Sequence, residues 1–225
     1  MEELRTLGRF AGARGEVVLR RRGRGDDAVD ELIVNGTFAM DSTETGSERR
    51  LARLAYELGP EGGRMLVGGL GLGYTAHEAL TLPVGEVEVV ELEAGLIRWA
   101  AEGVTPILAR LAGDPRVRLV AGDVARLLGE SPPGHWDAIA LDIDNGPDFL
   151  IHRENASVYT PEFLWLAHTR LARGGRLAIW CQGPSPQLLG TLRDIDPRAR
   201  EHLFKVQRGE RRFSYAIYTL DREPS

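Results

Sequence analysis

Apolar runs that alternate with helix-like segments constrain the fold of this chain more than any other feature of its sequence. The runs have the length and apolar character of buried strands, and they cover residues 64–67, 87–90, 116–120, 136–141 and 176–180. The segments with helical spacing cover residues 47–58, 74–82, 94–102, 106–112, 124–128 and 161–172. Strands joined through helices lie parallel, in a sheet that helices cover on both faces. The sequence therefore predicts an α/β fold with a mostly parallel, twisted sheet.

The N-terminal part departs from this alternation. Residues 16–20 and 31–34 are short β-rich runs, and residues 37–40 supply a returning strand. Asn35-Gly36 is a strong hairpin-turn dipeptide between the last two runs. We expect a small antiparallel layer here rather than an independently folding domain.

The C-terminal tail also departs from it. Residues 204–220 indicate two antiparallel strands joined by a turn at Gly209. No internal repeat or low-complexity linker divides the chain of 225 residues, which fits one domain with a small appendage. We therefore predict a β-hairpin region at residues 1–46 and a ligand-binding α/β domain at residues 47–225.

The composition limits the partners of the protein. Hydrophobic residues make up 43% of the chain and charged residues 27%, which are ordinary globular values. The net charge of −5 argues against nucleic acid as the main partner, because such a partner selects a clustered basic face. We interpret the one basic run as a solvated strand end, because acidic residues follow it at once (Arg20, Arg21, Arg22 and Arg24, then Asp26, Asp27, Asp30 and Glu31).

The sequence also carries expectations about compartment and metal content. Cys181 is the only cysteine, which excludes disulfides within the chain and fits a reducing cytoplasm. The N-terminus lacks the features of a signal peptide, and no segment approaches the ~18 apolar residues of a membrane helix. We expect a cytoplasmic protein with no membrane partner. The histidines lack metal-ligand spacing, so no metal is expected, and His152 is singled out only because it follows the acidic loop that begins at Asp142.

Polar residues just past the predicted strands form the candidate site, because ligands of open parallel sheets bind beyond the carboxyl ends of the strands. A glycine-rich loop follows the first strand and would let a ligand approach bare backbone (Gly68, Gly69, Gly71 and Gly73). Glu91 follows the second strand, 18 positions beyond Gly73, where a carboxylate accepts hydrogen bonds from ribose hydroxyls. This order predicts a nucleoside site.

The third and fourth strands add two more carboxylates. Asp123 and Val124 follow the third strand, where Asp123 could accept a hydrogen bond from an exocyclic amine. Asp142 begins an acidic loop after the fourth strand, at the mouth of the expected site. Each residue also has a structural interpretation, since the glycines could form only a tight turn and Asp123 could only cap the next helix. Their consistent position at strand ends favours nucleoside binding.

The glycine spacing separates two classes of nucleotide enzyme. The dinucleotide fingerprint Gly-x-Gly-x-x-Gly, taken from Gly69 and Gly71, places its third glycine on Tyr74. The sequence instead offers Gly69-x-Gly71-x-Gly73, the tighter spacing of S-adenosylmethionine-dependent methyltransferases. An NAD-dependent oxidoreductase is therefore a remote alternative.

From about residue 32 to residue 175 the chain resembles the spermidine synthase family, which has the Rossmann-like class I methyltransferase fold. The similar stretches are residues 66–73, 89–93, 116–123, 136–142 and 158–163. The resemblance implies that Glu91 holds the ribose, that Asp123 holds the adenine amino group, and that Asp142 is the acid/base residue facing the acceptor. A carboxylate beside a sulfonium centre can orient an amine and take its proton.

The chain departs from the family pattern on the acceptor side. Gly71 stands where the family has an aspartate that pairs with the free amine of decarboxylated S-adenosylmethionine. The family's Asp-Ser-Ser-Asp loop is Asp142-Ile143-Asp144-Asn145 here, its Gln falls on Ala39, and its Tyr-His-Glu is Gly46-Ser47-Glu48. Because of these departures, we expect the chain to lack most of the residues that form a polyamine-binding site.

The sequence thus predicts a spermidine synthase-like transferase that uses S-adenosylmethionine or its decarboxylated form. It favours transfer of a methyl group to a small-molecule acceptor, because Gly71 removes the acid that the decarboxylated donor would need. Aminopropyl transfer to a polyamine-like amine and nucleoside binding without catalysis are the alternatives. We also expect a homodimer, since an isolated hairpin must have its apolar face covered and the family commonly dimerises through this region.

Overall fold

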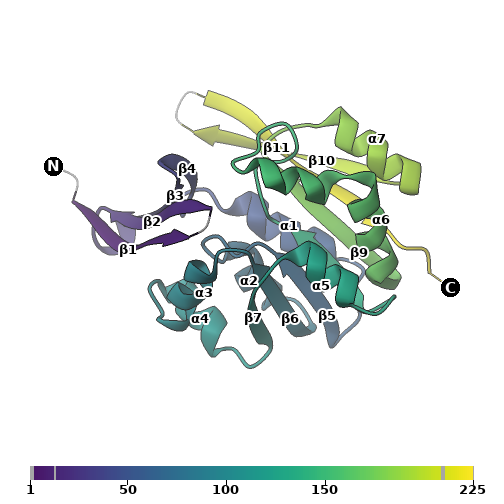
Figure 1. Cartoon of the computed structure of the whole chain (residues 1–225), viewed down its shortest axis with the longest axis horizontal. Helices are drawn as coiled ribbons and strands as arrows, with labels where there is room; N and C mark the ends of the chain where they lie inside the picture. Colours follow the sequence, from purple (N-terminus) through teal and green to yellow (C-terminus); the bar gives the residue numbers. More distant parts are fainter. Residues whose placement is uncertain (1–2, 13, 209–210, 225) are drawn as a thin grey trace.

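A computed structural model describes residues 3–12, 14–208 and 211–224 of the chain. Within these residues it contains a four-stranded antiparallel sheet near the N-terminus and a seven-stranded sheet flanked by helices (Figure 1). The turn predicted at Gly209 lies outside the described residues.

The seven-stranded sheet has the order β10-β11-β9-β8-β5-β6-β7. Five of its strands are parallel: β5 (Gly63–Gly68), β6 (Val84–Glu91), β7 (Val117–Ala121), β8 (Trp136–Leu141) and β9 (Leu171–Cys181). The last two form an antiparallel hairpin that pairs with β9: β10 (Arg200–Arg208) and β11 (Arg211–Asp221). The predicted α/β fold with an antiparallel C-terminal hairpin is confirmed.

Helices cover both faces of this sheet, and strand alternation explains how. On β5, Met65 and Val67 point to one face and Leu66 to the other, and all three are fully buried. The first face packs against α1 (Gly46–Tyr56), α2 (Tyr74–Ala79), α3 (Ala94–Ala101) and α4 (Pro106–Gly113). The second packs against α5 (Val124–Glu130), α6 (Pro161–Arg170) and α7 (Pro186–Ile195).

Two elements of this sheet and its cover differ from the prediction. Strand β9 begins at Leu171, so α6 ends at Arg170 and residues 174–175 lie inside the strand instead of separating helix from strand. The pairing with β8 shifts between Trp136 and Ala138, which leaves extra residues of β9 in a bulge. Gly174 has φ 78° in this bulge, a conformation that glycine adopts without strain. Helix α7 was not predicted.

The four-stranded sheet comprises β1 (Leu4–Gly12), β2 (Gly15–Arg22), β3 (Val29–Val34) and β4 (Thr37–Asp41) in sequential order. The predicted turn at Asn35 joins β3 to β4, whereas β1 was missed by the sequence pattern. The apolar face of the sheet is buried through Val17, Leu19 and Leu32, which belong to the same core as α1–α4. The chain itself therefore covers this face. The domain division at residue 46 stays a prediction.

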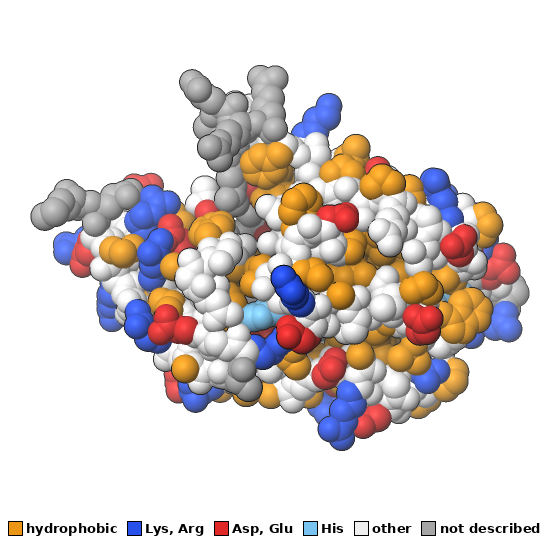
Figure 2. Space-filling model, turned by 45° about the horizontal axis from the view of Figure 1, so that its top comes forward, with side chains coloured by type: hydrophobic (Ala, Val, Ile, Leu, Met, Phe, Trp, Pro, Cys, Tyr) orange, Lys and Arg blue, Asp and Glu red, His pale blue; other side chains and the backbone are white. Residues whose placement is uncertain are grey.

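The basic run of the sequence lies on β2 and is paired across the sheet. Arg20 and Arg22 form ion pairs with Glu31, and Arg21 forms one with Asp30. Figure 2 shows Lys and Arg side chains gathered at this end of the molecule. Among the described helices, none combines the length and the apolar character needed to cross a bilayer.

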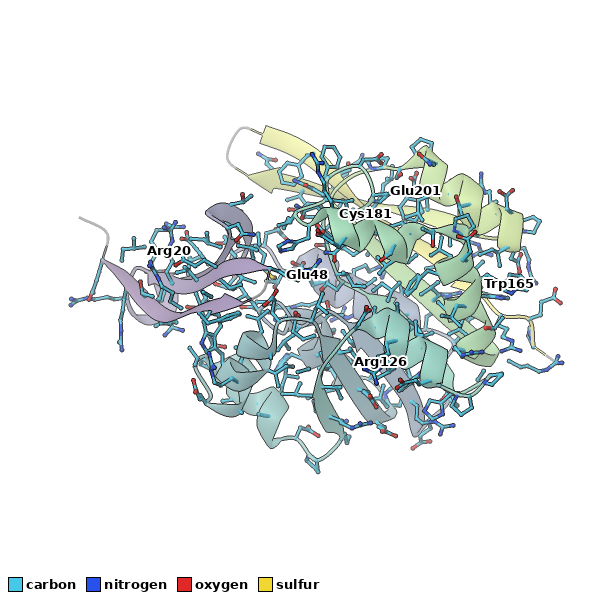
Figure 3. All side chains as sticks on the ribbon, viewed as in Figure 1. Arg20, Glu48, Arg126, Trp165, Cys181 and Glu201 are labelled. Carbon is cyan, nitrogen blue, oxygen red and sulfur yellow. The ribbon has the colours of Figure 1, made fainter. Side chains whose placement is uncertain are left out.

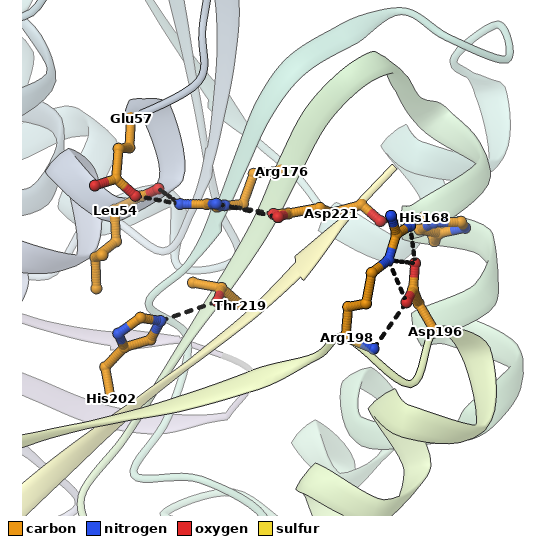
Figure 4. Close-up of polar contacts among 9 residues, drawn as sticks. All are labelled: Leu54, Glu57, His168, Arg176, Asp196, Arg198, His202, Thr219 and Asp221. Carbon is orange, nitrogen blue, oxygen red and sulfur yellow. Dashed lines mark hydrogen bonds and ion pairs between the residues drawn. The ribbon is translucent and has the colours of Figure 1, made fainter. Parts of the chain in front are cut away.

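Arg176 ties α1 to the last strand of the sheet (Figure 4). Its side chain is 7% exposed and forms ion pairs with Glu57 and with Asp221. It also donates a hydrogen bond to the carbonyl of Leu54 at 3.2 Å. Arg176 lies on β9, and its buried guanidinium contacts both the end of α1 and Asp221 on β11. These contacts anchor the helix to the two strands.

Replacing Arg176 tests the strength of this anchor. We expect Arg176→Leu to lower the free energy of unfolding by ~2–4 kcal/mol, because it leaves acceptors at the edge of the core without their cation. Arg126→Leu is the matched control, since its ion pair with Glu130 is 79% and 67% exposed and should contribute less than ~1 kcal/mol. Urea unfolding followed by circular dichroism measures both, and equal losses would contradict the anchoring role.

Candidate functional site

A cavity of about 240 Å³ lies at the carboxyl ends of the parallel strands, with the four-stranded sheet on its other side. Strand β5 pairs with β6 on one side and with β8 on the other, so the order of strands reverses here. In open α/β sheets this reversal creates the crevice in which ligands bind. The cavity therefore lies where the sequence predicted the site.

The glycine loop reaches the cavity through two of its four predicted glycines. Gly69 has φ 93°, and a Cβ built on it would lie 2.0 Å from the carbonyl oxygen of Asp142. Gly71 has φ 50° and lines the cavity beneath Met40, whose Sδ would lie 2.9 Å from an added Cβ. Gly68 and Gly73 lie outside the lining, because Gly68 ends β5 and Gly73 caps α2 against Leu111. Bare backbone therefore faces the cavity at Gly69 and Gly71.

Glu91, at the end of β6, is 8% exposed and lines the cavity. Its carboxylate accepts the backbone N–H of Leu70 at 2.8 Å and that of Glu93 at 2.8 Å. Burial raises its pKa, and the two backbone hydrogen bonds oppose the shift. Glu91 thus fixes the shape of the glycine loop while its remaining lone pairs stay available to a ligand.

Asp123 and Val124 lie where β7 gives way to α5. The Asp123 side chain is exposed at the cavity and accepts the backbone N–H of Ala125 at 2.8 Å, which makes it the N-cap of α5. One carboxylate oxygen remains for a ligand, so capping and binding are compatible. Val124 is 7% exposed and forms an apolar part of the wall.

Glu48, which is buried, and Asp142, which is half-buried, are two carboxyl groups that line the same cavity. The Thr75 hydroxyl donates to Asp142 at 2.6 Å, and the Ser47 hydroxyl donates to Glu48 at 2.7 Å. Burial raises the pKa of Asp142 to about 6. Burial together with the charge of Asp142 raises the pKa of Glu48 to about 7. The pair therefore titrates as a unit near neutral pH.

The sequence analysis did not predict Glu48 as a site residue, whereas the structure places it in the lining of the cavity. It lies in the first turn of α1, between the two sheets (Figure 3). Its signal in the sequence was the last position of the altered Gly46-Ser47-Glu48 motif, where the glutamate alone is retained. The other cavity residues missed by sequence reasoning include Arg14, Met40 and Asn155.

Asp144 has a different role from Asp142 although it belongs to the same loop. It is 7% exposed, and its carboxylate accepts four hydrogen bonds, from the backbone N–H groups of Asn145, Ile151 and His152 and from the Asn155 amide. These donors satisfy the carboxylate, so Asp144 holds the loop together. His152, the histidine singled out in the sequence, lines the cavity.

The charges around the cavity are strongly unbalanced. Among the described residues of its lining, seven are acidic and Arg14 is the one arginine or lysine (Glu48, Glu91, Glu93, Asp123, Asp142, Asp144 and Glu154). No group of three or more His, Cys, Asp or Glu among the described residues is arranged to hold a metal ion. Cys181 is buried, and burial raises the pKa of its thiol to about 12, so it is not an activated nucleophile.

The comparisons with known proteins agree with this geometry. No protein-family model matches the chain. Polyamine aminopropyltransferase 2 of Streptomyces coelicolor is 31% identical over 73% of the chain and 29% of its own length. Polyamine aminopropyltransferase of Korarchaeum cryptofilum is 29% identical over 53% of the chain and 36% of its own length. The chain belongs to a spermidine synthase-like family.

Other relatives add detail to this membership. Putrescine N-methyltransferase 4 of Nicotiana tabacum is 33% identical over 46% of the chain and 28% of its own length. A spermidine synthase solved with the transition state analogue AdoDATO has the same fold, with a TM-score of 0.81, 16% identity, and coverage of 98% of the chain and 75% of that protein. The chain thus spans about a third of the length of the first curated relatives. The chain therefore has the methyltransferase-like fold of the spermidine synthases.

Glu91→Gln tests the nucleoside end of the site. An amide would place an N–H₂ group against a backbone N–H that Glu91 now satisfies, so we expect affinity for 5′-methylthioadenosine to fall by ~1–3 kcal/mol. Glu86→Gln, on an exposed position of the same strand, is the charge-matched control and should bind as before. Calorimetric titration measures both, and unchanged affinity in Glu91→Gln would remove Glu91 from the binding site.

Proposed function

We propose that this chain transfers an aminopropyl group from decarboxylated S-adenosylmethionine to a small amine. The observation that carries the proposal is the excess of carboxylates around the cavity, with the buried Glu48 and the half-buried Asp142 both lining it. Several curated relatives are named polyamine aminopropyltransferases, which supports the same activity.

The charge of the donor decides between the two candidate donors. Two unit charges 4 Å apart interact by about 4 kcal/mol at an effective dielectric constant of 20. An acid-rich cavity therefore favours a donor with a sulfonium and an amine, and it repels the carboxylate that intact S-adenosylmethionine carries. The whole lining of the cavity therefore favours the decarboxylated donor, whereas Gly71 alone favours methyl transfer.

The residues present fit such a donor. Gly69 and Gly71 line the cavity with backbone, Glu91 would accept a hydrogen bond from the ribose of the donor, and Asp123 would accept one from its adenine. When bound, the donor would supply a three-carbon group on a sulfonium sulfur, which leaves as a neutral thioether when the acceptor nitrogen bonds to carbon. Asp142 would accept the proton that the amine loses.

Glu48 and Thr75 would prepare Asp142 for this role. The Thr75 hydroxyl holds one oxygen of Asp142, which leaves the other free to face the amine. Neither Glu48 nor Asp142 forms an ion pair with another described residue. A cationic amine would supply a positive charge beside Glu48 and Asp142. Because this charge favours the ionised carboxylates, binding of the amine and loss of protons from the two carboxyl groups would be linked.

Methyl transfer from intact S-adenosylmethionine is the second candidate. Gly71 favours it, since no acid projects from this position toward the donor tail. The relatives named putrescine N-methyltransferase support it more weakly, over less than half of the chain. Both candidates use an amine acceptor, so they differ in the donor.

A donor comparison separates the candidates. The full chain is incubated with either nucleoside and a panel of diamines, and release of 5′-methylthioadenosine or S-adenosylhomocysteine is measured. We expect 5′-methylthioadenosine from the decarboxylated donor. Release of S-adenosylhomocysteine alone would establish methyl transfer, and release of neither would leave a nucleoside-binding protein without catalysis.

Asp142→Asn tests the proposed base. We expect turnover to fall by about 10²-fold or more, because the amide cannot take the proton. Affinity for 5′-methylthioadenosine should change little, since Glu91 and Asp123 are untouched. Steady-state rates and calorimetric titration give the two values, and full turnover in Asp142→Asn would return the residue to a structural role.

The pH dependence of the reaction follows from the raised pKa values. Below about pH 6 the pair holds its protons and Asp142 cannot act as a base, so kcat/KM should rise with pH and level off above about 7. Glu48→Gln should leave the rising limb near pH 6, because burial raises the pKa of Asp142 and Glu48, with a pKa of about 7, is still neutral where Asp142 titrates. Glu86→Gln should keep the original profile. A limb that moves clearly to lower pH in Glu48→Gln would show that Glu48 loses its proton before Asp142 and would contradict this order.

The assembly and location of the protein stay proposals. The apolar face of the four-stranded sheet is buried within the chain, so a homodimer would have to use another surface, such as the edge strand β4, where Phe38 is 44% exposed. A cytoplasmic location, with neither nucleic acid nor membrane as a partner, is likewise proposed from the sequence.

A further inference from the structure

Arg14 links the four-stranded sheet to the loop that follows Asp142. It lies in the turn between β1 and β2, lines the cavity, and has a side chain that is 22% exposed. Its guanidinium donates to the side-chain oxygen of Asn155 at 3.0 Å and approaches Glu154 at 3.7 Å. The two partners lie in η2 (Arg153–Tyr159), more than 130 positions away in the sequence.

Asn155 continues this link into the loop. It is 8% exposed, and its side-chain amide donates to Asp144 at 2.7 Å. Asp144 in turn accepts the backbone N–H of Ile151 at 2.8 Å and that of His152 at 3.3 Å. The guanidinium, the amide and the carboxylate therefore form one chain of hydrogen bonds that ends on the backbone of the cavity wall.

The backbone of Arg14 is fixed from the other side. The side chain of Asn35 donates to the Arg14 carbonyl at 3.0 Å and accepts the Glu16 N–H at 2.9 Å. Gly15 has φ 118°, and a Cβ built on it would lie 1.7 Å from the Asn35 oxygen, so this bridge requires glycine there. Arg14 is thus held at its main chain by β3–β4 and at its side chain by η2.

We propose that Arg14 is a positioning residue that holds the acceptor side of the cavity closed through Asn155 and Asp144. The wall that it supports carries Ile151 and His152, both of which line the cavity, and it begins at Asp142. The nucleoside end is built on β6 and β7 through Glu91 and Asp123 and does not depend on this link. The assignment of this wall to the acceptor rests on the proposed function, whereas the mechanical link does not.

Hydrogen exchange tests the link without any assay of activity. In Arg14→Met the amides of Ile151 and His152 should exchange about five- to tenfold faster, because the chain of hydrogen bonds loses its outer donor. Asn35→Ala should give the same signature without changing the charge of the cavity. Arg9→Met is the control, since Arg9 lies on β1 and its ion pair with Glu16 is 63% and 48% exposed. Unchanged exchange at Ile151 and His152 in Arg14→Met would overturn the proposal.

Kinetics then separate positioning from general stability. We expect Arg14→Met to raise KM for the amine about tenfold while kcat and the affinity for 5′-methylthioadenosine stay within about twofold. Arg14→Lys should restore part of the effect, because its ammonium can still donate to Asn155. An equal loss of nucleoside and amine binding would contradict the proposal. Absence of turnover in the unsubstituted chain would count against the proposed function alone, and the exchange measurement would still decide the role of Arg14.

Discussion

The cavity depends on the close approach of two backbones at the ends of β5 and β8. The N–H of Asp142 donates to the carbonyl of Gly68 at 2.7 Å, and Gly69 next to it has no room for a side chain. Because backbone meets backbone here, the glycine loop and Asp142 line the same cavity. A larger residue at position 69 would push these loops apart, and the nucleoside loop and the candidate base would no longer share a cavity.

The acidic residues in and near the cavity differ in the cations and hydrogen-bond donors that surround their carboxylates. Glu78 is paired with Arg49 and Arg53, and four hydrogen-bond donors surround Asp144, so both are fully used by the fold. Asp142 and Glu48 each receive one hydroxyl donor from a side chain. Buried carboxylates without a cation keep raised pKa values and a strong preference for a positive ligand. The same criterion therefore separates structural acids from those left for a ligand.

The sequence could predict those parts of the site that lie directly after strands, because local periodicity locates strand ends. Glu91, Asp123 and Asp142 were found in this way, and all three line the cavity. Periodicity could not locate Glu48 or Arg14, since each reaches the cavity only through packing between elements far apart in the chain, and only the retained glutamate of the altered Gly46-Ser47-Glu48 motif pointed to Glu48. The same limit explains the missed strand β1, whose residues are mostly exposed and show no apolar alternation.

The four-stranded sheet takes part in the site as well as in the core. Val17 and Leu32 are 2% and 5% exposed, belong to the core beneath α1, and also line the cavity. Substitutions at these positions would therefore change stability and ligand binding together, and neither effect could be assigned to one cause. Arg14 is separable from this core, because its side chain contacts η2 through Asn155 and Glu154 and not through the apolar residues of the core. Apolar residues that also belong to the core therefore form one part of the cavity wall. The Arg14–Asn155 hydrogen bond, which lies outside that core, joins another part of the wall to the four-stranded sheet.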